Sequence, residues 1–474
     1  MLDVFNPDVL LQKMMNMFIH FVKKKSQMRT NPWKSGDKLK LLFAGYAGAR
    51  NTGGDVRVEE MIRQIRHVLG DENIDLSILT IDPALTQNYF EKVTQIKMHE
   101  IFPPFLYQEC PKHHGVVACE GSMFKSKFAD ALSTMMAGSL GMANAEEKIS
   151  VGYGAEAGFM NPPLKKFVKK HCKNSLILCR NKVSENLLEE MGIRTAPGTD
   201  TAWTFRPSSK ERAEELLRQK GWDGETKILT LGPIHPFCWP VKPSLKKSFE
   251  RYFWNRHKEQ HYKSVYFHHT SQKDEQKYED YILAIANAVK TFQTQHKVFP
   301  IIIGMEKLDR KACETLANKF DFKPPLFVSD EYNMYDMVGI LRRSAMLVTS
   351  RFHAIVCSMP GLVPSAGITM DERIQNMMIE RNHKHLLLQV DESNLEEKLK
   401  AILDILHKDA EKISQEIGSI IPKQLQLMGE MGIAFEDEVR RKHPEFPFPV
   451  RTRSWNEYLP QVDSNIEEIL RKFA

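Results

Sequence analysis

The sequence MLVTSRFHA (residues 346–354) places an arginine and a histidine where an apolar run gives way to a helical pattern. Residues 346–349 are typical of a parallel strand that is buried on both faces. Open α/β sheets bind ligands at the carboxyl ends of such strands, and the helix that follows presents free N–H groups there. Arg351 offers a bidentate charge for phosphate or carboxylate, and His353 offers a proton that moves near neutral pH. The stretch indicates either acid chemistry on an anionic substrate or local capping and pairing of the two side chains.

Similar apolar runs alternate with amphipathic segments on both sides of this stretch, which predicts βαβ units and parallel sheets. We expect strands at residues 38–45, 74–81, 115–119, 149–152 and 175–179, then at 227–231, 299–304, 325–328, 346–349 and 362–367. We expect helices at residues 55–69, 162–171 and 182–191, then at 278–292, 309–320, 333–343, 353–359, 372–379, 395–427 and 464–473. The pattern predicts an α/β protein with two halves packed around a cleft.

The predicted organisation has four parts. They are an N-terminal amphipathic extension (1–36), a first α/β domain (37–207), a second α/β domain (225–430) and a tail (431–474) that crosses back to the first domain. Residues 208–220, between the two domains, read as a helix or connector. The absence of a low-complexity linker favours domains that pack against each other.

Bulk composition excludes several classes of protein. A net charge of +6 over 474 residues, with basic and acidic residues interspersed, argues against nucleic acid as a partner. The seven cysteines form no CxxC pair, so we expect free thiols, a reducing compartment and no metal. No apolar run reaches the roughly 18 residues that span a bilayer. We therefore expect a cytoplasmic protein.

The N-terminal segment has apolar residues at near-helical spacing between Val9 and Val22, followed by Lys23, Lys24 and Lys25. One interpretation is an interfacial helix that makes peripheral contact with a membrane. The other is a helix docked on its own domain, with the lysines favoured by the helix dipole at its C-terminal end.

Glycine-rich loops and charged residues follow several of the predicted strands. The loop GYAGARNTGGD (residues 45–55) brings Gly53 and Gly54 to a helix start, where the backbone can approach a ligand and Asp55 can cap the helix. It lacks the spacing of a dinucleotide fingerprint and the lysine of a P-loop. The other substrate-binding candidates after strands are Glu120, Glu156, Arg180, His235 and Asp371. Each is also compatible with a structural role. Glu120 could be a loop carboxylate paired with Lys125 or Lys127, and Glu156 could simply belong to a glycine-rich turn at residues 152–158. Arg180 could form a surface pair, His235 could belong to a turn with buried aromatics, and Asp371 could be an N-cap.

Taken in this order, the motifs resemble the polysaccharide pyruvyl transferase family over about residues 40–385. The similarity rests on the loop at residues 45–55, on RNKVS (180–184) with Asp200 beyond it, and on SRFHA (350–354) with residues 364–371 downstream. The sequence departs from the family pattern at Glu120-Gly121-Ser122, where three glycines are expected, and at Asn181, where an aspartate is expected.

The resemblance implies a GT-B-like fold with two facing Rossmann-like domains, the first on the acceptor side and the second on the donor side. It implies transfer of a pyruvyl group from phosphoenolpyruvate to two hydroxyls of a saccharide in surface polysaccharide biosynthesis, without a resident cofactor. Arg351 and Arg180 would hold the donor, and His353 would act as general acid. If the N-terminal helix is interfacial, the acceptor is lipid-linked. The alternatives are a GT-B glycosyltransferase that uses a nucleotide sugar and a non-catalytic carbohydrate-binding protein of the same fold.

Overall fold

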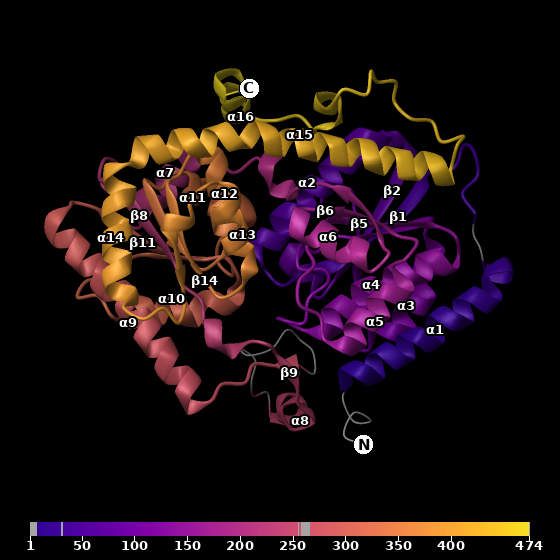
Figure 1. Cartoon of the computed structure of the whole chain (residues 1–474), viewed down its shortest axis with the longest axis horizontal. Coiled ribbons are helices and arrows are strands. Elements are labelled where there is room, and N and C mark those ends of the chain that lie inside the picture. The colour runs from indigo at the N-terminus through magenta and orange to yellow at the C-terminus, as the bar shows by residue number, and fades with distance from the viewer. Residues whose placement is uncertain (1–6, 30–31, 255, 257–265, 474) are drawn as a thin grey trace.

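A computed structural model describes residues 7–29, 32–254, 256 and 266–473 of the chain. It contains two large β-sheets with helices packed against them, which lie side by side (Figure 1). The first sheet has the strand order β3-β2-β1-β4-β5-β6-β7, and the second has the order β12-β11-β8-β13-β14-β15. All strand pairs within both sheets are parallel. The predicted α/β class with two parallel sheets is confirmed.

We call each large sheet, together with the helices packed against it, a layer. The N-terminal helix α1 (Pro7–Arg29) precedes the first layer in the chain. Its strands are β1 (Leu39–Ala47), β2 (Ile74–Thr80), β3 (Thr94–Lys97), β4 (Gly115–Ala118), β5 (Ile149–Ala155), β6 (Leu176–Cys179) and β7 (Arg194–Pro197). Its helices are α2 (Thr52–Leu69), α3 (Phe102–Glu109), α4 (Asp130–Ala145), α5 (Pro162–His171) and α6 (Lys182–Glu190). The helix α7 (Lys210–Gln219) then leads to the second layer.

The second layer contains β8 (Ile228–Gly232), β11 (Phe299–Gly304), β12 (Leu326–Val328), β13 (Met346–Thr349), β14 (Ser365–Thr369) and β15 (Leu387–Gln389). Its helices are α9 (Gln272–Gln295), α10 (Arg310–Ala317), α11 (Met334–Arg342), α12 (Phe352–Ser358), α13 (Glu372–Glu380) and α14 (Leu395–Lys408). Between β8 and α9 the chain forms an excursion with β9 (Lys242–Pro243), α8 (Leu245–Trp254) and β10 (Tyr266–Phe267), in which β9 and β10 pair antiparallel.

The strand order of each sheet reverses at one point, and this sets where a ligand can bind. In the first sheet β1 lies between β2 and β4, and in the second β8 lies between β11 and β13. Ligands of open α/β sheets occupy the crevice at the carboxyl ends of the strands where the order reverses. The loops after β1 and β4 flank one such crevice, and the loops after β8 and β13 flank the other. The backbone N–H of Thr52 donates to the carbonyl of Met305 over 2.8 Å, which joins the two layers beside these loops.

Several elements differ from the sequence prediction. The edge strands β3 and β7 were missed because their half-exposed residues form no apolar run. The helix α4 was missed because it is buried around most of its circumference and has no amphipathic pattern. Residues 152–158 were predicted as a turn, but β5 continues to Ala155, so Glu156 directly follows the strand.

The helix α1 packs on α4, as the docked interpretation expects. Met15, Ile19 and Val22 are buried. Glycines on α4 allow the close approach, because a Cβ atom on Gly138 would lie 2.2 Å from the Cε of Met15. Residues 1–6 and 30–31 of the predicted N-terminal extension lie outside the described residues.

The C-terminal helix α15 (Ala410–Lys442) runs along both layers (Figure 1). Its apolar positions continue at helical spacing through Met428, Phe435 and Val439, all of which are buried. The side-chain amide of Gln64 on α2 donates to the carbonyl of Met428 over 2.6 Å, which ties α15 to the first layer. The predicted single helix at 395–427 is therefore wrong, since two helices meet at Asp409. The predicted boundary at residue 430 falls inside α15, and α16 (Ser464–Phe473) ends the described chain.

Candidate active site

Arg57 on α2 is the centre of a buried polar network at the carboxyl ends of the first sheet. Its guanidinium is fully buried and lies 2.9 Å from the carboxylate of Asp200, measured from Nε to Oδ2. It also donates to the carbonyl oxygens of Gly154 over 2.8 Å and of Cys119 over 3.3 Å. These contacts join α2 to the ends of β4 and β5. Gly154 has a φ of +62°, and a Cβ atom there would lie 2.8 Å from the Nη2 of Arg57.

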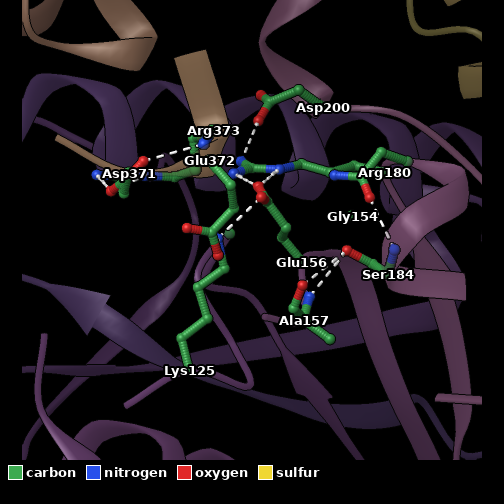
Figure 2. A network of polar contacts seen from close by, with 12 residues as sticks. Lys125, Gly154, Glu156, Ala157, Arg180, Ser184, Asp200, Asp371, Glu372 and Arg373 are labelled. Carbon is green, nitrogen blue, oxygen red and sulfur yellow. Dashed lines mark hydrogen bonds and ion pairs between the residues drawn. The ribbon is translucent and has the colours of Figure 1, made fainter. Parts of the chain in front are cut away.

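Arg180, directly after β6, extends this network (Figure 2). Its Nη1 lies 3.1 Å from Asp200 Oδ2, and its Nε donates to Glu156 Oε2 over 2.6 Å. Lys125 donates to the other oxygen of Glu156 over 2.8 Å. Although burial opposes ionisation, Arg180 and Lys125 hold the pKa of Glu156 below its usual value. All of these groups are buried, so their mutual pairing offsets their desolvation.

Three contacts carry the network across to the second layer. His353 in the first turn of α12 places its Nε2 3.3 Å from Asp200 Oδ2. The guanidinium of Arg180 lies 4.5 Å from the ring centroid of Phe352. Lys125 lies 3.0 Å from Glu372 at the start of α13. The site is therefore built by both layers, and neither holds all of its groups.

Electrostatics fix the protonation of the His353–Asp200 pair. Burial opposes ionisation of Asp200, but Arg57 and His353 outweigh it and hold the pKa of Asp200 far below its usual value. Burial lowers the pKa of His353, although Asp200 acts in the opposite direction. A neutral imidazole beside an ionised carboxylate must donate from Nε2, which leaves Nδ1 with a free lone pair. This arrangement orients His353 to accept a proton at Nδ1.

The start of α2 lies against His353, which gives Gly53 a specific role. A Cβ atom on Gly53 would lie 2.3 Å from the Nδ1 of His353. We expect Gly53→Ala to displace the imidazole from Asp200 and to lower activity by about 100-fold, since small misplacements of reacting groups have such effects.

The neighbouring Gly54→Ala variant is the matched control, because its nearest contact would be an ordinary 3.7 Å. Alanine there should leave activity unchanged and raise the free energy of unfolding by about 0.5–1 kcal/mol. Equal activity of the two variants, measured at matched stability, would show that contact with Gly53 does not position His353.

Arg351, predicted to clamp an anion, is held by two carboxylates from the turn between β11 and α10. Its Nε donates to Asp309 Oδ2 over 2.9 Å, and its Nη2 lies 2.9 Å from Glu306 Oε2. Burial raises the pKa of both acids, and that of Glu306 rises to about 6. The other predicted clamp, Arg180, is likewise paired with Glu156 and Asp200. An anion that binds to either arginine would have to exchange with a carboxylate.

Asp55 and Glu120 lie near this junction but do not make the predicted contacts. Asn51, rather than Asp55, caps α2 by accepting from the backbone N–H of Gly54. Asp55 is buried, and its Oδ1 has no hydrogen-bond partner among the described residues. Burial, with a contribution from Glu120, raises its pKa well above the usual value. Glu120 accepts from the N–H of Gly121, whereas Lys125 pairs with Glu156 and Glu372.

His235 and Asp371 have structural contacts. The ring of His235 stacks on Tyr278 with 4.1 Å between the ring centroids, and its Nε2 lies 3.6 Å from Glu275 Oε2. Neither partner belongs to the network around Asp200. Asp371 caps α13 and pairs with Arg373 over 2.7 Å. Its neighbour Glu372 reaches the site instead.

Sequence reasoning missed Arg57, Lys125, Glu306, Asp309 and Glu372. Arg57 occurs at an ordinary position on an amphipathic helix, and its partner Asp200 lies far along the chain. Asp200 belongs to the motifs on which the family resemblance rests, and this was the available sequence signal for this part of the site.

Comparison with known proteins agrees with this geometry. The family model described as polysaccharide pyruvyl transferase matches residues 51–372, which include every group of the network. No curated protein sequence matches the chain. Among solved structures, the chain is similar to Anabaena Alr3699/HepE in complex with UDP-glucose, with a TM-score of 0.53 at 10% identity over 84% of this chain and 100% of that chain. It is also similar to the UDP-GlcNAc 2-epimerase from Methanocaldococcus jannaschii, with a TM-score of 0.49 at 13% identity over 78% of this chain and 93% of that chain. The Anabaena likeness shows the GT-B arrangement of two Rossmann-like layers.

Proposed function

Because the chain belongs to the polysaccharide pyruvyl transferase family, we propose that it transfers a pyruvyl group from phosphoenolpyruvate to two hydroxyls of a saccharide. The products are a cyclic ketal and inorganic phosphate. The observation that carries the proposal is the His353–Asp200 pair, which joins the segment after β7 of the first layer to the helix after β13 of the second. A neutral imidazole oriented by an ionised carboxylate is suited to taking a proton from an alcohol that adds to an enol phosphate.

Proton balance gives His353 two roles in the proposed reaction. In the first addition, an acceptor hydroxyl forms a bond to C2 of the donor, loses its proton to Nδ1 of His353, and the methylene carbon C3 gains a proton. In the second step the C2–O bond to phosphate breaks, and a second hydroxyl attacks the oxocarbenium-like carbon and loses its proton. The leaving phosphate takes up one proton, so two hydroxyl protons end on C3 and phosphate. His353 starts neutral, so it can act as the general acid predicted from sequence only after it has accepted a proton.

The donor is a small polyanion, and Arg351 and Arg180 are the proposed cations that hold it. The ring of Phe352 links them, since it follows Arg351 in the chain and stacks under Arg180. When the donor binds, it would replace a protein carboxylate as the partner of one or both guanidinium groups. Burial raises the pKa of Glu306 to about 6, and protonation there would neutralise one of the two carboxylates that pair with Arg351.

Calorimetric titration with phosphoenolpyruvate tests the donor, with UDP-glucose as the competing ligand. We expect wild-type protein to bind phosphoenolpyruvate and Arg351→Lys to bind it at least about tenfold more weakly, because lysine cannot form the bidentate contact. Arg351→Lys keeps the charge that Glu306 and Asp309 require, so the fold should be retained.

Binding of UDP-glucose by the wild type, without binding of phosphoenolpyruvate, would overturn the proposal in favour of a nucleotide-sugar glycosyltransferase. An unchanged affinity in Arg351→Lys would remove Arg351 from the donor site.

A further inference from the structure

The helix α8 exposes a cluster of large aromatic side chains. Phe249, Tyr252, Phe253 and Trp254 have exposed fractions of 53%, 82%, 61% and 61%. The rings touch one another, with centroids of Phe249 and Phe253 4.3 Å apart. Single exposed apolar residues are normal on a protein surface, but a contiguous exposed patch marks an interaction site.

Specific contacts hold α8 against the body of the protein. Arg251 on α8 lies 3.1 Å from Glu100 of the first layer, and Lys247 donates to the carbonyl of His268 over 2.9 Å. Just before β9, the N–H of Val241 donates to the carbonyl of Phe128 over 3.1 Å. The aromatic rings are therefore presented outward by a helix whose polar side chains anchor it.

The N-terminal helix α1 lies beside this excursion, at the same edge of the molecule (Figure 1). The hydroxyl of Tyr266 on β10 donates to Asp8 Oδ1 on α1 over 2.5 Å, which joins the two elements. Leu10, Met17 and Phe21 are 55%, 45% and 41% exposed. Met17 follows Leu10 by seven positions and Phe21 follows Met17 by four, so the three side chains share one face of α1.

Cations accompany the apolar residues on both helices. Lys13 and Lys24 are exposed at positions that fall on the same face of α1 as Leu10 and Met17. Lys246 is exposed on α8. The acidic neighbours Asp8 and Glu100 are engaged by Tyr266 and Arg251. The surface thus combines aromatic rings and exposed positive charge.

We propose that α8 and the exposed face of α1 form a docking surface for an anionic phospholipid bilayer. Tryptophan and tyrosine favour the headgroup region of a bilayer, and phenylalanine and leucine enter the acyl boundary beneath it. Lysines beside them meet lipid phosphates. A second copy of the chain fits less well, because a two-fold contact through this surface would bring like-charged lysines together. Among the described residues, no helix is long and apolar enough to cross a membrane.

Co-sedimentation of the full chain with vesicles tests the proposal. We expect binding to phosphatidylcholine vesicles that contain phosphatidylglycerol, and much weaker binding to pure phosphatidylcholine. The triple variant Tyr252→Ser/Phe253→Ser/Trp254→Ser should bind at least about tenfold more weakly, and Lys24→Gln about fivefold more weakly. The matched control is Phe322→Ser/Ile379→Ser, which removes two side chains that are 49% and 47% exposed elsewhere and should bind like wild type.

Failure of the wild type to sediment with the anionic vesicles would overturn the proposal. Equal losses in the triple variant and in the control would do the same, because the effect would then not belong to this surface. Sedimentation velocity without lipid gives the third test. A dimer that dissociates in the triple variant would assign the surface to a second copy of the chain.

Discussion

The His353→Gln variant is expected to lose about 100- to 10,000-fold in kcat for pyruvyl transfer, the range that a positioned general acid or base contributes. Glutamine has a similar reach and can still donate a hydrogen bond to Asp200. It cannot accept a proton at the position of Nδ1, so both additions to the donor would lack their base. Affinity for phosphoenolpyruvate should change little, because the donor is held by Arg351 and Arg180. Steady-state kinetics and calorimetry on the same preparation separate the two quantities.

The control for this variant is His385→Gln, which replaces an exposed histidine outside the network. It should retain wild-type kcat. The pH profile adds a readout that a purely structural effect would not produce. Burial lowers the pKa of His353 below the usual 6.5, so the wild-type rate should fall only when the pH drops under that value. An active His353→Gln enzyme that keeps the same acidic limb would remove His353 from the proton transfers.

The sequence was most informative where local chemistry decides the structure. The run at residues 346–349 forms β13 as predicted, because an apolar strand followed by a helix start is a local pattern. The same reasoning placed His353 and Arg180 at a crevice. It could not say what they contact there, because Arg180 and His353 meet at Asp200 only after two layers have packed together. The two arginines consequently looked like open anion clamps, whereas folding pairs both of them with carboxylates.

Long-range packing also explains the errors in the tail and around Lys125. The helix α15 passes the predicted boundary at residue 430 because its buried apolar positions continue through Met428, Phe435 and Val439 without a change in pattern. Lys125 was considered a partner of Glu120, which is close in sequence. Its contacts with Glu156 and Glu372 depend on β5 and on α13 of the other layer.

The Asp200→Ala variant is expected to lower the free energy of unfolding by about 3–5 kcal/mol, because removing one partner leaves buried charges without compensation. Asp200 is 3% exposed and contacts Arg57, Arg180 and His353. Among the described residues, Arg57 would retain only backbone carbonyls as partners, and Arg180 would retain Glu156. The matched control is Glu215→Ala, which breaks an exposed pair with Arg212 and should cost no more than about 1 kcal/mol. Chemical denaturation of both variants and the wild type gives these values.

The dependence of this loss on pH distinguishes a charge effect from a cavity. The folded-state pKa of Asp200 is lowered, so its contribution to stability is complete above the usual value of 3.8 and disappears as the pH falls toward the folded-state pKa. Glu306 acts with the opposite sign between 4.5 and about 6, since its pKa is raised, and wild type and variant share that term. Asp200 also raises the pKa of His353, so His353 titrates differently in the two proteins below its usual value of 6.5. The difference between wild type and Asp200→Ala should therefore be constant above pH 6.5 and shrink below pH 3.8. A difference that stays constant in acid would mean that lost packing, rather than the charge shared with Arg57, Arg180 and His353, accounts for the destabilisation.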